Sequence, residues 1–169
     1  LPLPVGMQSR CEILDFEIED GSVELASLPA RLNAVLPAGI RVLSAYESAR
    51  KVKELTHLHA EAFLEYDAGV PADAAKTLAA FFTRESIVIT KHSKKGNKEV
   101  DIRPLIHTME LTDAGQGVLR LDTVISAQNP GLNPQLLVSA IETYLPDYRP
   151  DFARFSRLEV LDAQMNPFR

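Results

Sequence analysis

The chain has 169 residues, of which 46% are hydrophobic and 24% charged, and its formal net charge is −5. A chain of this length and composition can bury a hydrophobic core, which excludes an intrinsically disordered protein. The acidic balance excludes a general attraction to nucleic acids or anionic membranes, so binding to either would need a local basic patch.

Cysteine content and hydropathy limit the class further. Cys11 is the only cysteine, which excludes an internal disulfide framework and a cysteine-ligated zinc or iron–sulfur site. No apolar run approaches the roughly 20 residues that span a bilayer. We therefore expect a cytoplasmic protein that does not bind membranes and carries no cofactor. The chain starts with Leu1-Pro2-Leu3-Pro4 instead of Met, and we expect a fragment that lacks its N-terminal part.

Residues 1–48 are predicted to form a first α+β subdomain. Residues 10–20 alternate between apolar and acidic side chains, as in a half-buried strand. Leucines at helical spacing follow in residues 25–36, and residues 40–46 alternate again. The order is therefore strand, helix, strand, and an exposed basic connector is expected at residues 49–56.

Residues 57–146 are predicted to form a second α+β subdomain that contains a long basic hairpin. It opens with a strand at residues 59–67, in which every second residue is apolar. Asp73 is placed to cap the helix that follows. The predicted hairpin runs from Ile87 to Leu111 and turns at Gly96-Asn97.

A strand at residues 118–126 and a helix at residues 134–145 complete the predicted second subdomain. Residues 147–169 are expected to be a partly extended C-terminal tail. These elements predict an α+β fold with two strand–helix–strand halves, in which ferredoxin-like antiparallel sheets carry helices on one face. The periodicity leaves the strand order open.

The hairpin carries the candidate polyanion site. Lys91, Lys94, Lys95 and Lys98 concentrate positive charge on one turn of an acidic chain, and Arg103 lies on the returning strand. Phosphate backbones attract such arrays through counterion release, and a guanidinium can add a bidentate contact. The alternative is a solvated hairpin tip whose lysines discourage edge pairing.

Other reactive residues do not converge in the sequence, so we predict no catalytic residues and no metal site. Asp101 and Arg103 share a strand face at i, i+2 and are expected to form an ion pair. His57 and His59 make a His-x-His pair that is a weak metal candidate without a third ligand. Cys11 is expected to be a packed thiol.

Three motifs carry a family resemblance. They are Leu3-Pro4-x-Gly6-x-x-Ser9, Leu32-Asn33-Ala34-x-Leu36-Pro37-x-Gly39, and the run from Lys98 to Ile106 behind a lysine-rich turn. In this order they resemble the radical-SAM-linked domain of unknown function, a bacterial family found beside, or fused to, cobalamin-type radical S-adenosylmethionine proteins. The resemblance implies a radical S-adenosylmethionine protein as partner and a missing N-terminal strand and helix.

The sequence therefore predicts a non-catalytic accessory module that works with a radical S-adenosylmethionine protein and contacts RNA through the basic hairpin. One alternative is a purely structural protein–protein interaction domain whose exposed sheet edges pair with that partner. The other is a stand-alone metal-dependent enzyme, which would need a pocket that joins His57 and His59 with Asp101 or Arg103.

Overall fold

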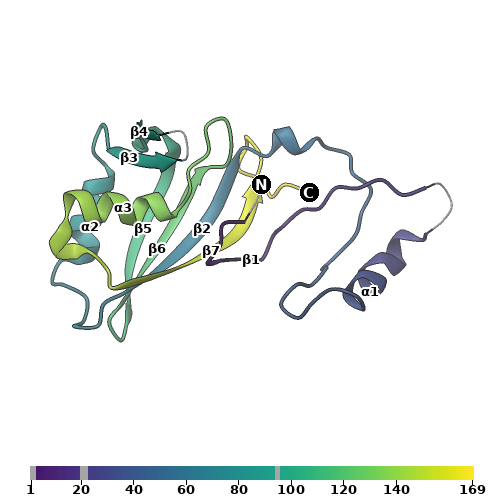
Figure 1. Ribbon diagram of the computed structural model, residues 1–169, viewed down its shortest axis with the longest axis horizontal. Coiled ribbons are helices and arrows are strands. Elements are labelled where there is room, and N and C mark those ends of the chain that lie inside the picture. Colours follow the sequence, from purple (N-terminus) through teal and green to yellow (C-terminus); the bar gives the residue numbers. More distant parts are fainter. Residues whose placement is uncertain (1–2, 20–22, 94–95) are drawn as a thin grey trace. The chain divides into compact units, whose positions relative to one another are not determined.

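The computed structural model describes residues 3–19, 23–93 and 96–169 (Figure 1). The chain divides into two compact units. The first, here called the sheet unit, consists of residues 1–12 and 53–168. The second, here called the small unit, consists of residues 13–52 together with Arg169.

A five-stranded sheet organises the sheet unit. Its strand order is β1-β7-β2-β6-β5, and every neighbouring pair is antiparallel except β1 and β7, which are parallel. In chain order the strands are β1 (Met7–Ser9), β2 (His57–Glu65), β5 (Ile106–Gly115), β6 (Val118–Ser126) and β7 (Phe152–Leu161).

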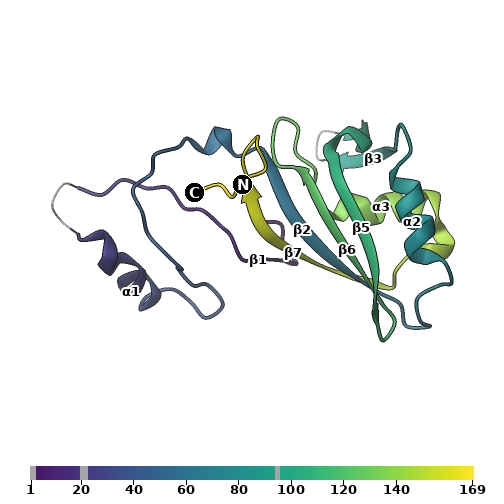
Figure 2. The ribbon, with the colours of Figure 1, turned by 180° about the vertical axis from the view of Figure 1, so that it is seen from behind.

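Two helices pack on one face of this sheet. Both views place α2 (Ala74–Phe82) and α3 (Gln135–Tyr144) on the same side of it (Figures 1 and 2). Every second residue of β2 and β6 faces these helices, and the side chains on that face are buried. The core joins sheet residues such as Leu64, Leu121 and Ile125 to helix residues such as Leu78, Phe82 and Ile141.

A separate two-stranded sheet, β3 (Val88–Ser93) with β4 (Gly96–Asp101), follows α2 in the chain. Three short 3-10 helices complete the sheet unit or join it to the small unit: Val52–Glu54, Arg103–Leu105 and Pro146–Tyr148. Among the described residues, no helix is both long and apolar enough to cross a membrane.

The predicted α+β class is confirmed by this mixture of helices and largely antiparallel strands. The strand predicted at residues 59–67 is β2, and its apolar residues Ala60, Ala62 and Leu64 are buried as expected. The helix predicted at residues 134–145 is α3. Periodicity identified both because each element has one fully buried face.

The cap of α2 differs from the prediction. Asp73 is the N-cap residue, but its side chain forms no capping hydrogen bond. Its backbone adopts a left-handed conformation with φ of 58°, and its carbonyl oxygen accepts a hydrogen bond from the Thr77 amide at 2.8 Å. Because N-cap residues normally have extended backbones, this conformation turns the carboxylate away from the usual capping geometry.

The long hairpin predicted from Ile87 to Leu111 is split in two. The Ile102 amide donates to the Ile87 carbonyl and closes a short β3–β4 hairpin. A 3-10 turn at Arg103–Leu105 then precedes β5, which pairs with β6 in the main sheet. Pro104 explains the break, because proline lacks the N–H that a continuous ladder requires. The register pairs Ser93 with Gly96, so Gly96-Asn97 belongs to β4 and not to the turn.

The C-terminal region contains a strand that the sequence analysis did not anticipate. Within residues 147–169, β7 lies between β1 and β2 in the sheet. Its pairing with β2 shifts register between His59 and Ala60. This irregularity interrupts the alternation of buried and exposed residues, which is the pattern that identifies a strand in a sequence.

In the described part of the small unit, one α-helix is formed, α1 (Leu28–Asn33), which follows a 3-10 turn at Leu25–Ser27. Pro29 lies in the first turn of α1, where the N–H that proline lacks would have no partner within the helix. The strands predicted at residues 10–20 and 40–46 are not formed: the described residues of both stretches have no strand assignment. A strand needs a hydrogen-bonded neighbour, and among the described residues of the small unit neither residues 13–18 nor residues 43–47 have one.

Candidate functional site

The β3–β4 hairpin, which carries the predicted polyanion site, is anchored at its base. Ile87 and Ile89 are buried in the core of the sheet unit. The Tyr144 hydroxyl of α3 donates a hydrogen bond to the Val88 carbonyl at 2.5 Å. These contacts fix the base of the hairpin against the core and α3. The lysines lie beyond this base, toward the turn.

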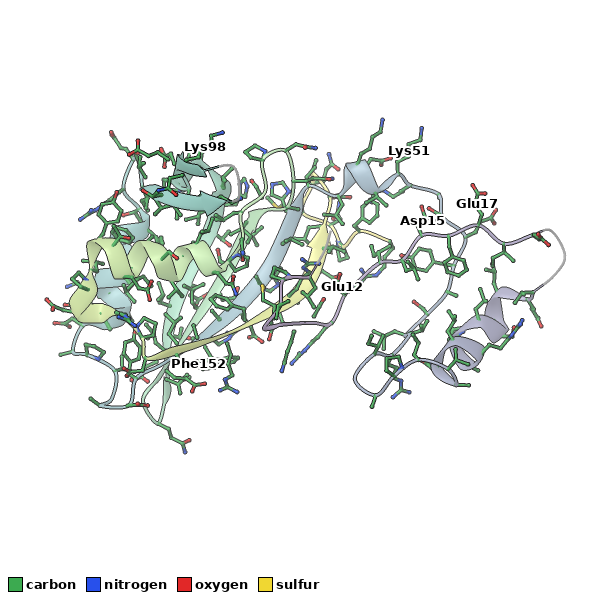
Figure 3. All side chains as sticks on the ribbon, in the orientation of Figure 1. Glu12, Asp15, Glu17, Lys51, Lys98 and Phe152 are labelled. Carbon is green, nitrogen blue, oxygen red and sulfur yellow. The ribbon has the colours of Figure 1, made fainter. Side chains whose placement is uncertain are left out.

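Lys91 and Lys98 lie directly opposite each other on β3 and β4, and both are exposed. Opposed residues project from the same face of a sheet, so the two ammonium groups are neighbours. Glu99 faces the other way, opposite Thr90. Within the described part of the chain, neither lysine forms an ion pair. Lys98 projects outward from β4 (Figure 3).

Two of the predicted lysines, Lys94 and Lys95, lie outside the described residues. Arg103, the fifth predicted residue, is half-buried in the 3-10 turn after β4. Its Nη1 donates a hydrogen bond to the Ile106 carbonyl at 2.8 Å. One end of the guanidinium therefore holds the chain where β5 begins, and a phosphate contact by Arg103 stays a prediction.

The predicted ion pair between Asp101 and Arg103 is replaced by backbone contacts. Asp101 Oδ1 accepts hydrogen bonds from the amides of Ile87, at 2.9 Å, and Arg103, at 3.0 Å. The Ile87 amide is the main cause that lowers the pKa of Asp101 below its usual value, and Arg103 contributes less. β4 ends at Asp101, so the two residues do not share a strand face.

The sheet face opposite the helices carries an ionic network that the sequence analysis missed. Arg120 Nη2 lies 2.6 Å from Asp122 Oδ2, and Arg120 Nε lies 3.2 Å from Glu61 Oε2. His59 Nε2 lies 2.8 Å from Asp122 Oδ1. The register pairs Glu61 with Asp122 across β2 and β6, so Arg120 is needed to compensate two neighbouring carboxylates.

His57, the other half of the predicted metal pair, contacts a third histidine instead of His59. The rings of His57 and His107 meet edge to face with centroids 4.4 Å apart. His57 Nδ1 lies 2.8 Å from Thr56 Oγ1, and His107 Nε2 lies 2.9 Å from Ser126 Oγ. Burial, followed by the charges of His57 and Arg103, lowers the pKa of His107.

These contacts describe hydrogen-bonded imidazoles on β2 and β5. A search of the described residues finds no group of three or more histidine, cysteine, aspartate or glutamate side chains that could hold a metal ion. A metal site normally needs at least three protein ligands. His57 and His107 are far apart in the sequence, and the register of β2, β5 and β6 brings their rings together. The sequence alone therefore does not show this contact.

Cys11 is half-buried beside β7. Its Sγ lies 3.8 Å from both Ser9 Oγ and the Arg157 carbonyl oxygen. Burial is the main cause that raises the pKa of the Cys11 thiol. A raised pKa keeps the thiol protonated at neutral pH, and a protonated thiol is a poor nucleophile.

A pocket of about 180 Å³ lies at the β1 edge of the helix-covered face. Its lining is mostly apolar, with Met7, Leu58 and Leu132 among its residues, and Arg157 is the one charged side chain among the described residues that line it. Arg157 is buried, and its Nη1 lies 2.7 Å from Glu12 Oε1. This pair neutralises the charge at the pocket wall.

Together these features define an α+β domain with a basic hairpin on one sheet and a polar, histidine-containing face on the other. The chain belongs to a family described as an uncharacterized protein conserved in bacteria (DUF2344), whose model matches residues 1–134. No curated protein and no solved structure matches the chain significantly. The predicted link to radical S-adenosylmethionine proteins stays a prediction.

Proposed function

We propose that the protein is a non-catalytic accessory module that binds RNA through the β3–β4 hairpin and presents it to a radical S-adenosylmethionine protein. The RNA half of the proposal is supported by local charge. The identity of the partner is supported only by the sequence resemblance. The observation that carries the RNA half is the exposed, cross-strand pair of Lys91 and Lys98.

Like charges placed directly opposite each other destabilise a two-stranded sheet. Neither Lys91 nor Lys98 forms an ion pair with a described carboxylate that would offset the repulsion between them. A bound phosphate would offset it, and each phosphate neutralised by a lysine releases condensed counterions. Lys94 and Lys95 lie between the paired lysines in the sequence and add to the local charge.

Binding of RNA would be tested with a labelled single strand of about 20 nucleotides, which exceeds the usual binding-site size. The wild-type protein is expected to bind with an affinity that falls steeply with salt. The double reversal Lys91→Glu/Lys98→Glu is expected to weaken binding and to reduce the slope of log K against log salt by about 1.4. Fluorescence anisotropy at several salt concentrations measures both quantities.

The matched control is Lys53→Glu/Lys76→Glu, which changes the net charge equally at exposed positions outside the hairpin. It is expected to leave the slope unchanged. Equal losses in the two double variants would mean that net charge, and not the hairpin, governs binding. Salt-independent binding, or none, would remove the RNA half of the proposal.

A second candidate function is a purely structural protein–protein interaction domain. The observation in its favour is the exposed apolar surface of the small unit, where Leu14, Phe16 and Leu43 are all exposed. It predicts that the protein co-purifies with the radical S-adenosylmethionine protein of its native host. It also predicts that Lys91→Glu/Lys98→Glu does not disturb that association.

A further inference from the structure

The small unit exposes apolar side chains that a folded domain would normally bury. Leu14 is 79% exposed, Phe16 50% and Leu43 74%. Among the described residues of this unit, only Leu28 is buried. One buried side chain cannot offset the conformational entropy lost when some 40 residues are ordered, at about 1 kcal/mol or more for each residue.

The backbone of the same region also has amides and carbonyls that can form hydrogen bonds with an added chain. Within the described part of the small unit, the main chains of residues 13–18 and 43–47 form no hydrogen bonds. The stretch near the second segment is fastened to α1 by side-chain contacts: Asn33 accepts a hydrogen bond from the Val42 amide at 2.8 Å and donates one to the Val42 carbonyl at 3.0 Å. A segment without regular secondary structure, whose amides and carbonyls form no hydrogen bonds, can accept an added strand.

The side chains of residues 13–18 specify what kind of strand fits. Leu14, Phe16 and Ile18 alternate with Asp15 and Glu17, and in an extended chain alternate residues project to opposite sides. Asp15 and Glu17 extend from the same side of the chain (Figure 3). A complementary strand would therefore place apolar residues opposite the first set and basic residues opposite the carboxylates.

We propose that residues 13–18 bind, by strand addition, a segment of a different protein chain in which apolar and basic residues alternate. A second copy of this chain does not satisfy the charge requirement. Pairing two copies around Phe16 places Asp15 opposite Glu17 when they are antiparallel, and each carboxylate opposite itself when they are parallel. Both arrangements oppose like charges, which destabilises the pair.

The probe is a labelled peptide of about nine residues, within the usual range of strand lengths, in which valine and lysine alternate. Full-length protein is titrated against it in fluorescence anisotropy. We expect saturable binding and slower amide hydrogen exchange in residues 13–18. A peptide of alternating valine and glutamate is expected to bind about tenfold more weakly. A valine–lysine peptide of the same composition without alternation controls for simple charge attraction and is expected to bind weakly.

Charge reversal provides the sharpest test. Asp15→Lys/Glu17→Lys is expected to exchange the preference, so that the valine–glutamate peptide binds more tightly than the valine–lysine peptide. The matched control, Glu24→Lys/Asp147→Lys, makes the same change in net charge at exposed positions outside the segment and should keep the original preference. Leu14→Ser/Phe16→Ser should abolish binding of both peptides.

Four outcomes would overturn the proposal. Two concern the peptides: equal binding of the alternating and non-alternating peptides, and a preference that does not follow the charges at positions 15 and 17. Two concern the protein: hydrogen exchange in residues 13–18 that the peptide does not slow, and a stable dimer in light scattering in which the same residues are protected. A urea unfolding curve of each variant that matches the wild type confirms that the sheet unit is intact, so loss of binding cannot be attributed to unfolding.

Discussion

His107 shows how burial and a neighbouring side chain together lower the pKa of a histidine. Burial is the main reason that the pKa of His107 lies below the ordinary value of 6.5, and the neighbouring His57 lowers it further. We therefore expect His57→Gln to raise the pKa of His107 toward, but not up to, 6.5, because burial remains. The imidazole proton resonances of His107, followed by NMR against pH, measure this change.

His59→Gln is the matched control, because His59 is held by Asp122 on the same strand face. It is expected to leave the titration of His107 unchanged. If both variants raise the pKa of His107 by the same amount, the edge-to-face contact between His57 and His107 is not the cause.

At the scale of an element, Asp101 closes the base of the basic hairpin. Asp101→Asn replaces a charged acceptor of two amide hydrogen bonds with a neutral one. We expect it to lower the free energy of unfolding by about 1 kcal/mol at neutral pH, after allowance for solvent at this half-exposed position. Urea unfolding of the wild type and the variant measures the difference.

The pH dependence of that difference follows from the direction of the pKa shift. The pKa of Asp101 is lower in the folded protein than its ordinary value of 3.8, so the unfolded chain binds the proton first. The stabilisation is fully present above that ordinary value and is lost as the pH falls through the folded pKa. Wild type and Asp101→Asn should therefore converge in acid. Asp147→Asn, which removes a carboxylate at an exposed position, is the control and should match the wild type at neutral pH.

Elements with one clearly buried face could be predicted from the sequence. β2 and α3 were found because their apolar residues repeat at the period of a strand or a helix. β7 was missed because its buried face includes Arg157, and because its register shift opposite His59 and Ala60 breaks the alternation. The hairpin was predicted to run on from β4 into β5, and Pro104 and its 3-10 turn interrupt it.

The candidate sites were predictable to different degrees. The charge of the hairpin can be read directly from its lysines, but the pairing of Lys91 with Lys98 depends on the β3–β4 register. The contact of His57 with His107 and the bridge from Arg120 to Glu61 join different strands. Side-chain alternation gives the face on which a residue lies, whereas strand order and register decide its neighbours.

At the scale of the whole molecule, the two units differ in how much they bury. The sheet unit has a continuous core of side chains from the sheet and its helices. Among its described residues, the small unit buries only Leu28. Regions with few buried apolar contacts open with little free energy, while a packed core opens only on global unfolding. A partner strand would supply the small unit with the burial that it lacks by itself.

We therefore expect hydrogen exchange to separate the two units in the protein alone. Amides of β2 and β6, which are hydrogen-bonded on both sides in the sheet, should exchange slowest. Amides of residues 13–18 and 43–47 should exchange at rates close to those of an unfolded chain, because they have no hydrogen-bond acceptors within the described small unit. Mass spectrometry of peptic fragments measures both sets in one experiment.

Leu121→Ala, which removes a buried side chain of β6, should speed exchange in β2 and β6 and leave residues 13–18 unaffected. Protection of residues 13–18 equal to that of β2 would show that the small unit is already complete, and would contradict its need for an added strand.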